Sequence, residues 1–267
     1  MSVQSVGGIS IAYDEYGSGI PFVLLHGHPF NHTMWQDQRE ALQAICRVIT
    51  PDLRGYGETT VVPGKTTMAE FARDLAALLD ALAIERIILG GLSMGGQIVF
   101  EFYRQFPERV RALLLADTQP QVDTEEVRAA RYTTAERILA EGMQDFATEL
   151  LPRLLARETM ASQPKVVERV RQMIVNTPPA GAAAALRGRA ERQDYTPVLG
   201  EIAVPTLIVV GSEDEFTPVQ DAQLMHQGIA GSQLAILEGV GHMPNMERPF
   251  EFNAVLRKFL LPIISAN

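Results

Sequence analysis

The chain has 267 residues, 46% of them hydrophobic, and a formal net charge of −9. This length and apolar content are sufficient for a large buried core. The acidic balance and the lack of a Lys/Arg-rich run argue against binding to nucleic acid or to an anionic membrane. The single cysteine, Cys46, excludes a disulfide within the chain and a cysteine metal cluster, and its apolar neighbours predict a buried, unreactive thiol.

The chain begins with MSVQSVGGIS, which has neither the basic segment nor the apolar segment of a secretory signal. No apolar run farther along approaches the length of a membrane span. We therefore expect a cytoplasmic protein.

The first 121 residues alternate between strand and helix patterns. Short apolar runs that end at glycine or aspartate predict strands, and apolar residues at spacings of three and four predict amphipathic helices. The expected strands cover residues 9–17, 21–27, 86–91 and 110–117 and the start of 47–59, and the expected helices cover residues 34–45, 66–84 and 94–107.

The pattern changes in residues 122–195, where Ala, Arg, Glu and Leu dominate and Pro-containing breaks separate consecutive expected helices. Alternation resumes with a strand within 205–218, a helix from Val219, a strand over 232–239 and a last helix from Pro249. Such alternation predicts an α/β fold, a mostly parallel sheet with helices on both faces. We therefore predict a core in two parts, residues 1–121 and 196–267, and a helical lid of residues 122–195 over the carboxyl edge of the sheet.

The segment GLSMGG, residues 91–96, lies between an expected strand and an expected helix and contains a G-x-S-x-G motif. Gly91 and Gly95 leave room for a sharp turn that presents Ser93 at the start of a helix, where backbone N–H groups favour developing negative charge. The simpler alternative is a connection in which Ser93 only caps the helix. A phosphate-binding loop fits less well, because no Lys follows and the G-x-G-x-x-G spacing is absent.

A serine hydroxyl needs a base to act as a nucleophile, and the base needs an acid that orients it. His242 lies in a Gly-flanked loop between the last expected strand and the last expected helix, and Asp214 follows a strand. The chain order Ser93, Asp214, His242, with all three residues at strand ends, indicates a catalytic triad. Asp117 also ends an expected strand and remains an alternative acid.

Five segments of the chain resemble, in order, those of the α/β-hydrolase superfamily. They are HGHP from residue 26, PDLRGYGET from residue 51, GLSMGG from residue 91, VPTLIVVGSEDEFTP from residue 204 and GVGHMPNMERP from residue 239. The chain is most similar to the lid-bearing group around 3-oxoadipate enol-lactonases, small carboxylesterases and cofactor-free haloperoxidase-type perhydrolases. The resemblance implies the α/β-hydrolase fold, with a mostly parallel eight-stranded sheet flanked by helices and an inserted helical lid, and it implies that no cofactor is needed.

The segment LLHGHPFNH places His26, His28 and His32 close together, which raises the alternative of a metal site. Such a site would lack a nearby Cys, Asp or Glu ligand, and we do not expect a metal. The resemblance implies instead that the backbone N–H groups of His28 and Met94 form an oxyanion hole. His26 is then expected to brace the loop by hydrogen bonding.

We predict a serine hydrolase that cleaves a carboxylic ester or lactone of a small molecule through an acyl-enzyme intermediate. A C–C bond hydrolase and a perhydrolase use the same triad and remain alternatives, and so does a ligand-binding signalling protein with slow or no turnover. The acyl group, the alcohol group and the oligomeric state do not follow from the sequence.

The substrate pocket is expected to be apolar and to take a neutral substrate, with Phe30, Leu139 and Phe146 in its lining. A substrate carboxylate would need a cation in the pocket, and no basic residue is adjacent to the catalytic motifs. The lid arginines are expected mostly in solvent; they include Arg128, Arg131, Arg137, Arg187 and Arg189.

Overall fold

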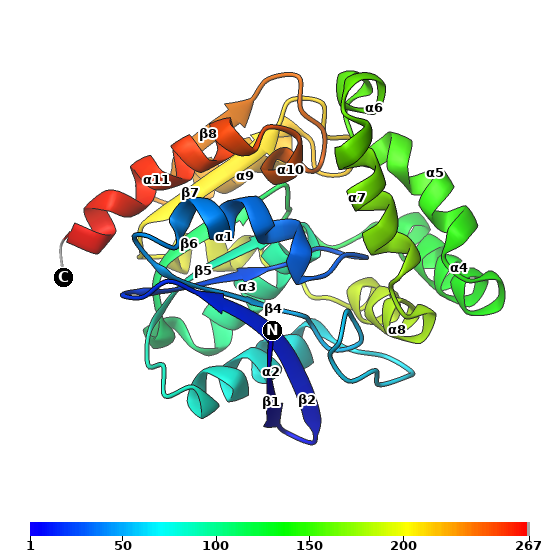
Figure 1. Cartoon of the computed structure of the whole chain (residues 1–267), viewed down its shortest axis with the longest axis horizontal. Coiled ribbons are helices and arrows are strands. Elements are labelled where there is room, and N and C mark those ends of the chain that lie inside the picture. The colour runs from blue at the N-terminus through cyan, green and yellow to red at the C-terminus, as the bar shows by residue number, and fades with distance from the viewer. Residues whose placement is uncertain (266–267) are drawn as a thin grey trace.

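The protein is described by a computed structural model that covers residues 1–265, in which eight strands form one sheet in the order β1-β2-β4-β3-β5-β6-β7-β8 (Figure 1). The strands are β1 Ser2–Val6, β2 Ile9–Tyr16, β3 Pro21–Leu25, β4 Arg47–Pro51, β5 Ile87–Leu92, β6 Val110–Ala116, β7 Thr206–Gly211 and β8 Gln233–Leu237. Strand β2 pairs antiparallel with both β1 and β4, and the other neighbouring pairs are parallel. The predicted mostly parallel α/β sheet is therefore confirmed.

The edge strand β1 is not among the expected strands. Its side chains are mostly exposed, and Val6 alone of its five residues is buried. A strand with one buried side chain does not give the apolar alternation on which sequence reasoning depends.

The helices of the core cover both faces of the sheet. They are α1 Gln36–Leu42, α2 Met68–Ala81, α3 Met94–Gln105, α9 Val219–Gly228, α10 Pro244–Glu247 and α11 Pro249–Ser265, with short 3₁₀ turns at η1 His32–Trp35, η2 Pro107–Arg109 and η3 Thr196–Glu201. Val23 and Leu25 of β3 pack in one apolar cluster with α2, α3 and α9, whereas Phe22 and Leu24 pack in a second with α1 and α11. This alternation is the period of two that a strand buried on both faces requires. None of the helices within residues 1–265 is long and apolar enough to cross a membrane.

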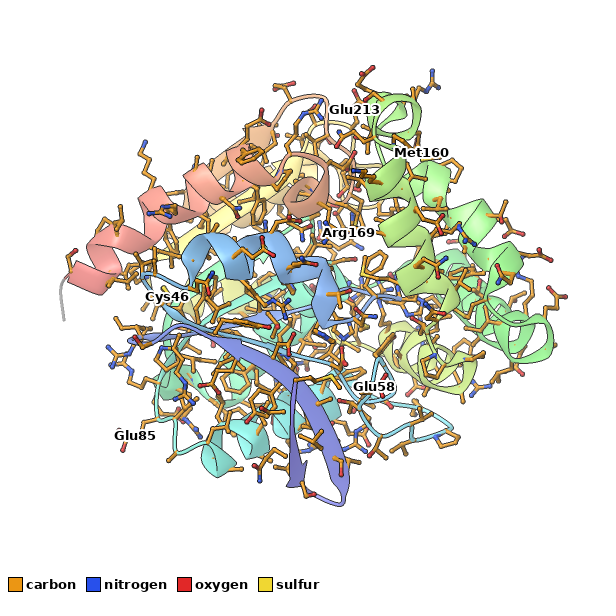
Figure 2. The ribbon with its side chains drawn as sticks, in the orientation of Figure 1. Cys46, Glu58, Glu85, Met160, Arg169 and Glu213 are labelled. Carbon is orange, nitrogen blue, oxygen red and sulfur yellow. The ribbon has the colours of Figure 1, made fainter. Side chains whose placement is uncertain are left out.

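Cys46 lies where the chain passes from α1 into β4 (Figure 2) and is completely buried in the second cluster. Burial raises the pKa of its thiol to about 11. The thiol therefore stays protonated and unreactive at neutral pH, as expected from its apolar neighbours.

Residues 122–195, called the helical insertion here, lie between β6 and β7 and gather on one side of the sheet (Figure 1). Their helices are α4 Glu125–Glu141, α5 Gln144–Leu154, α6 Arg157–Ser162, α7 Pro164–Val175 and α8 Pro179–Ala190. The insertion packs directly on the core, because a Cβ built on Gly181 of α8 would lie 1.8 Å from the carbonyl oxygen of Gly55. Arg169 extends from α7 toward α1 (Figure 2), where its Nη1 lies 3.1 Å from Oδ2 of Asp37.

Candidate active site

Ser93 occupies the sharp turn between β5 and α3. Its φ of 56° lies in the left-handed region, which disfavours residues other than glycine. The neighbouring glycines allow this turn, since a Cβ on Gly91 would lie 2.3 Å from the carbonyl carbon of Gly95, and a Cβ on Gly95 would lie 2.3 Å from the carbonyl oxygen of Leu25. Close packing of β5, α3 and the end of β3 thus holds Ser93 at the head of α3.

His242 and Asp214 follow β8 and β7, and their side chains are in contact. Nδ1 of His242 lies 2.8 Å from Oδ2 of Asp214, which also accepts a hydrogen bond from the Thr217 hydroxyl at 2.6 Å. Burial acts to raise the pKa of Asp214, but the positive charge of His242 and the hydrogen bonds from His242, Thr217 and the Phe216 N–H outweigh it and lower the pKa. Asp214 is therefore suited to be an ionised acceptor that fixes the His242 ring.

Ser93 and His242 line one cavity of about 550 Å³. No hydrogen bond joins their side chains within residues 1–265, and contacts of this kind often tighten only when substrate binds. The backbone N–H of His242 donates to the carbonyl of Leu154 at 2.8 Å. The end of α5 therefore helps to position the histidine loop.

The backbone N–H groups of His28 and Met94 have no hydrogen-bond acceptor in the described part of the chain. Met94 is the first residue of α3, where an N–H has no partner within the helix. The loop that carries His28 passes beside Ser93, since a Cβ on Gly27 would lie 3.3 Å from Cβ of Ser93. Two unpaired N–H groups next to a serine match the requirements of an oxyanion hole.

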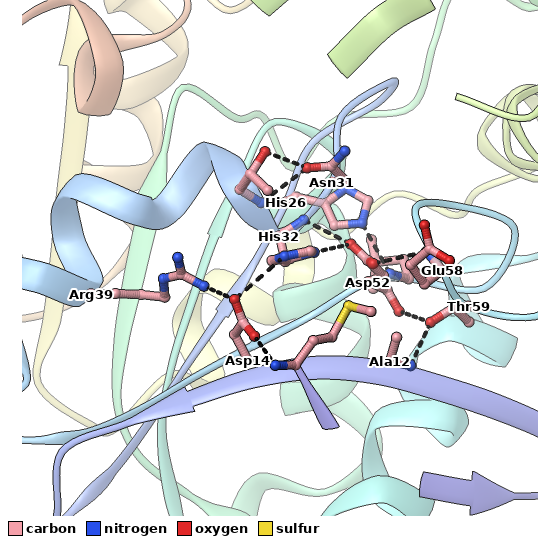
Figure 3. A network of polar contacts seen from close by, with 12 residues as sticks. Ala12, Asp14, His26, Asn31, His32, Arg39, Asp52, Glu58 and Thr59 are labelled. Carbon is pink, nitrogen blue, oxygen red and sulfur yellow. Dashed lines mark hydrogen bonds and ion pairs between the residues drawn. The ribbon is translucent and has the colours of Figure 1, made fainter. Parts of the chain in front are cut away.

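Two of the three loop histidines brace the loop (Figure 3). Nε2 of His26 accepts a hydrogen bond from the backbone N–H of Leu53 at 3.0 Å, and burial lowers the pKa of His26 to about 4. In His32, Nδ1 lies 2.8 Å from Oδ1 of Asp52 and Nε2 lies 3.5 Å from Oδ2 of Asp14. The bracing role expected for His26 is confirmed, and His26 and His32 each have partners of their own.

His28 differs from the other two because its ring lines the cavity. Its Nδ1 lies 2.8 Å from the hydroxyl of Tyr56, and its Nε2 is buried without a partner among residues 1–265. Burial lowers the pKa of His28 well below its usual value, and the charges of Arg189 and Arg131 act in the same direction. His28 is thus a neutral ring with one nitrogen free for a ligand.

Asp117, the alternative acid, directly follows β6. Its Oδ1 accepts a hydrogen bond from the backbone N–H of Gly211 at 2.9 Å, whereas Asp214 is the carboxylate that contacts Nδ1 of His242. One oxygen of Asp117, one of Asp214 and one ring nitrogen of His242 all lie within 4.8 Å of one another. This is the one group of three potential metal-ligating side chains in the described residues, and it contains none of the loop histidines.

The structure corrects two of the three predicted pocket residues. Phe146 lines the cavity, with its ring centroid 6.3 Å from that of His28. Phe30 instead is completely buried in the second apolar cluster, and Leu139 on α4 is 44% exposed to solvent. Only Ala135 and Ile138 of α4 are buried, so the helix has no broad apolar stripe from which its inner face could be predicted.

Most of the lid arginines are expected in solvent, but Arg131 and Arg189 line the cavity. Arg131 forms two hydrogen bonds with Asp123, at 2.6 and 3.0 Å, and Arg192 contacts the same carboxylate at 2.6 Å. Arg189 donates to Oε1 of Gln97 at 3.2 Å and has no carboxylate partner within residues 1–265. Two guanidinium groups therefore share the Asp123 carboxylate, and a third, that of Arg189, has no carboxylate partner in the described residues.

Sequence reasoning missed several residues of this site. Gln97 lies four positions after Ser93, on the same helix face, and that spacing could have identified it. Asp123, Arg192 and Thr217 carry no comparable signal, because each acts through contacts that only the folded chain creates.

The fold and the site together define a class of protein. The family model described as "alpha/beta hydrolase fold" matches residues 20–249, and the chain belongs to this family. Among curated relatives, the chain is 31% identical to 3-oxoadipate enol-lactonase 1 of Acinetobacter baylyi over 87% of this chain and 85% of the relative.

Similar solved structures include an esterase and an enol-lactonase. A thermophilic esterase from Thermogutta terrifontis, with malate bound, is 41% identical, with a TM-score of 0.95 over 98% of this chain and 97% of that one. The enol-lactonase from Burkholderia xenovorans is 28% identical, with a TM-score of 0.91 over 97% and 99% of the two chains.

Proposed function

We propose that the protein is a serine hydrolase that cleaves a carboxylic ester or lactone of a small molecule. Ser93 attacks the substrate carbonyl while His242 takes its proton, and Asp214 orients His242 and stabilises the imidazolium. The N–H groups of His28 and Met94 stabilise the oxyanion, and His242 returns the proton to the leaving alkoxide. Water then hydrolyses the acyl-enzyme with His242 as its base.

The observation that carries this proposal is the strained turn at Ser93, which lines the same cavity as His242, the residue that Asp214 contacts. Backbone strain of this kind concentrates at functional sites, because in an ordinary connection it would only lower the stability of the fold. The enol-lactonase and esterase relatives support the choice of an ester or lactone over a C–C bond or a peracid.

We further propose that the substrate carries a carboxylate. Burial lowers the pKa of Arg189 well below its usual value, and the charges of Arg131 and Arg192 add to this effect. An arginine remains charged in proteins, so the shift measures how unfavourable its surroundings are for a cation. A substrate carboxylate would relieve this repulsion, and the malate bound to the Thermogutta terrifontis esterase shows that a similar chain accepts a carboxylate ligand.

The experiment compares hydrolysis of p-nitrophenyl butyrate with that of mono-p-nitrophenyl succinate, which has a carboxylate at the end of a similar acyl chain. Many turnovers with excess ester support the hydrolase, whereas one turnover or none would favour a ligand-binding protein. A preference of about tenfold or more in kcat/KM for the succinate ester, or about 1.4 kcal/mol, is expected. Turnover of both esters without this preference would contradict the proposal of a carboxylate-bearing substrate but would still support the proposed hydrolase function.

A further inference from the structure

Asp117 lies behind the His242–Asp214 pair in a conformation that is unusual for an aspartate. Its φ is 41°, in the same left-handed region as Ser93, and its backbone N–H donates to the carbonyl of Val209 at 3.0 Å. The residue is 1% exposed. The ends of β6 and β7 therefore hold this carboxyl group in place, close to Asp214.

One oxygen of Asp117 has no donor. Oδ1 accepts from the Gly211 N–H, but Oδ2 is buried without a hydrogen-bond partner in the described residues. The neighbouring Asp214 already accepts from Nδ1 of His242 and the Thr217 hydroxyl. Two ionised carboxylates are both acceptors and cannot satisfy each other. A proton on Asp117 would turn its unpaired oxygen into a donor and remove the repulsion between the two groups.

The charges around Asp117 favour this proton. Burial raises the pKa of Asp117 well above its usual value, and the negative charges of Asp214 and Glu247 raise it further, against a hydrogen bond from the Gly211 N–H that lowers it. His242 is the cation-forming group in this cluster, and its Nδ1 is directed at Asp214.

We propose that Asp117 is a neutral carboxylic acid that shares its proton with Asp214, so that the pair carries one negative charge and Asp117 positions Asp214 against His242. This positioning role rests on the proposed hydrolase function, but the protonation of Asp117 does not. A pair with one negative charge stabilises the imidazolium that forms when Ser93 loses its proton. A pair with two negative charges would make His242 hold its proton more strongly and would hinder the transfer of that proton to the leaving group.

Infrared difference spectroscopy tests the protonation state directly. The spectrum of the wild type minus that of Asp117→Asn, at about pH 8, where ordinary carboxyl groups are ionised, is expected to contain the C=O stretch of one protonated carboxylic acid. The matched control is Asp221→Asn, which removes a half-buried carboxyl group outside the cluster and is expected to remove a carboxylate band. Loss of a carboxylate band in the Asp117→Asn spectrum, with no acid C=O band, would overturn the proposal.

The pH profile of kcat/KM tests the charge of Asp117 in the active enzyme. The Asn amide can donate to Asp214 and accept from Gly211 as the neutral acid does, so the midpoint of the acid limb in Asp117→Asn is expected to move by less than about 0.3 pH unit. An ionised Asp117 would instead favour protonated His242, and its loss would lower that midpoint by about one pH unit or more.

Asp117→Ala removes the donor altogether and is expected to lower kcat about tenfold, with most of the loss restored in Asp117→Asn. Circular dichroism of both variants checks that they fold. A large shift of the midpoint in Asp117→Asn would overturn the neutral acid, and wild-type kcat in folded Asp117→Ala would overturn the positioning role. If the wild type hydrolyses no ester, the hydrolase proposal fails, and the infrared result still decides the protonation state.

Discussion

Arg189 of α8 donates through Nε to Oε1 of Gln97 on α3 at 3.2 Å, which links the helical insertion to the helix that follows Ser93 directly. This contact uses one edge of the guanidinium, and the residue lines the cavity. The geometry makes Arg189 the strongest candidate for binding a substrate carboxylate.

Arg189→Met should lower kcat/KM for mono-p-nitrophenyl succinate by about tenfold or more, because a charge-assisted hydrogen bond in a desolvated site is lost. The effect on p-nitrophenyl butyrate should stay within about twofold. Steady-state kinetics with the two esters measure both values.

The matched control is Arg187→Met on the same helix. Arg187 is bound to the carbonyl of Gly64 at 2.8 Å and to Glu136 at 2.7 Å, and it does not line the cavity. Its loss should leave the ratio between the two esters unchanged. Equal losses for both esters in Arg189→Met would show that Arg189 supports the fold and does not select the anion.

Asp214→Asn should reduce kcat by about 10³–10⁴-fold, because the imidazolium of His242 loses its compensating charge and its fixed orientation. The control is Asp221→Asn. Asp221 is a nearby aspartate that accepts a hydrogen bond from the Gln121 side chain at 3.1 Å. Single-turnover hydrolysis of p-nitrophenyl acetate gives the rates. A small loss of kcat in Asp214→Asn together with a large loss in Asp117→Asn would mean that Asp117, and not Asp214, is the acid of the triad.

The order of strands and helices could be predicted because each buried strand and amphipathic helix carries its own local pattern. The turn at Ser93 was predictable for the same reason, since Gly91 and Gly95 lie beside it in the sequence. The direction in which side chains of the helical insertion point was not predictable, because it depends on tertiary contacts. Arg189 is 92 residues from Gln97, to which it bonds, and nothing near it in the sequence distinguishes it from solvent-facing Arg137.

The stability of the protein should fall as the pH drops from about 6.5 toward 4, partly through His26. Its folded-state pKa of about 4 lies below the usual histidine pKa of 6.5, so protonation favours the unfolded chain. The stabilisation is complete above the unfolded-state pKa and is lost as the pH falls, by up to about 3 kcal/mol.

The test of this linkage is urea denaturation of the wild type and His26→Asn at several pH values. The variant should be less stable at neutral pH, since it leaves the Leu53 N–H less well paired, but its stability should fall less between pH about 6.5 and 4. Parallel curves for the two proteins would show that His26 does not contribute to the acid loss.

Hydrolysis should continue in the presence of EDTA. His26 and His32 are committed to Leu53, Asp52 and Asp14, and the proposed mechanism uses a proton acceptor in place of a Lewis acid. Activity and metal content measured before and after dialysis against the chelator test this. Loss of activity that zinc restores would support a metal site at the loop histidines.

The proposed mechanism depends most on Ser93 as the nucleophile. A fluorophosphonate probe followed by peptide mapping should place a single adduct on Ser93, and Ser93→Ala should take no label and lose activity by about 10⁴-fold or more while keeping its fold. Label on another residue, or wild-type ester hydrolysis by folded Ser93→Ala, would contradict the proposed mechanism.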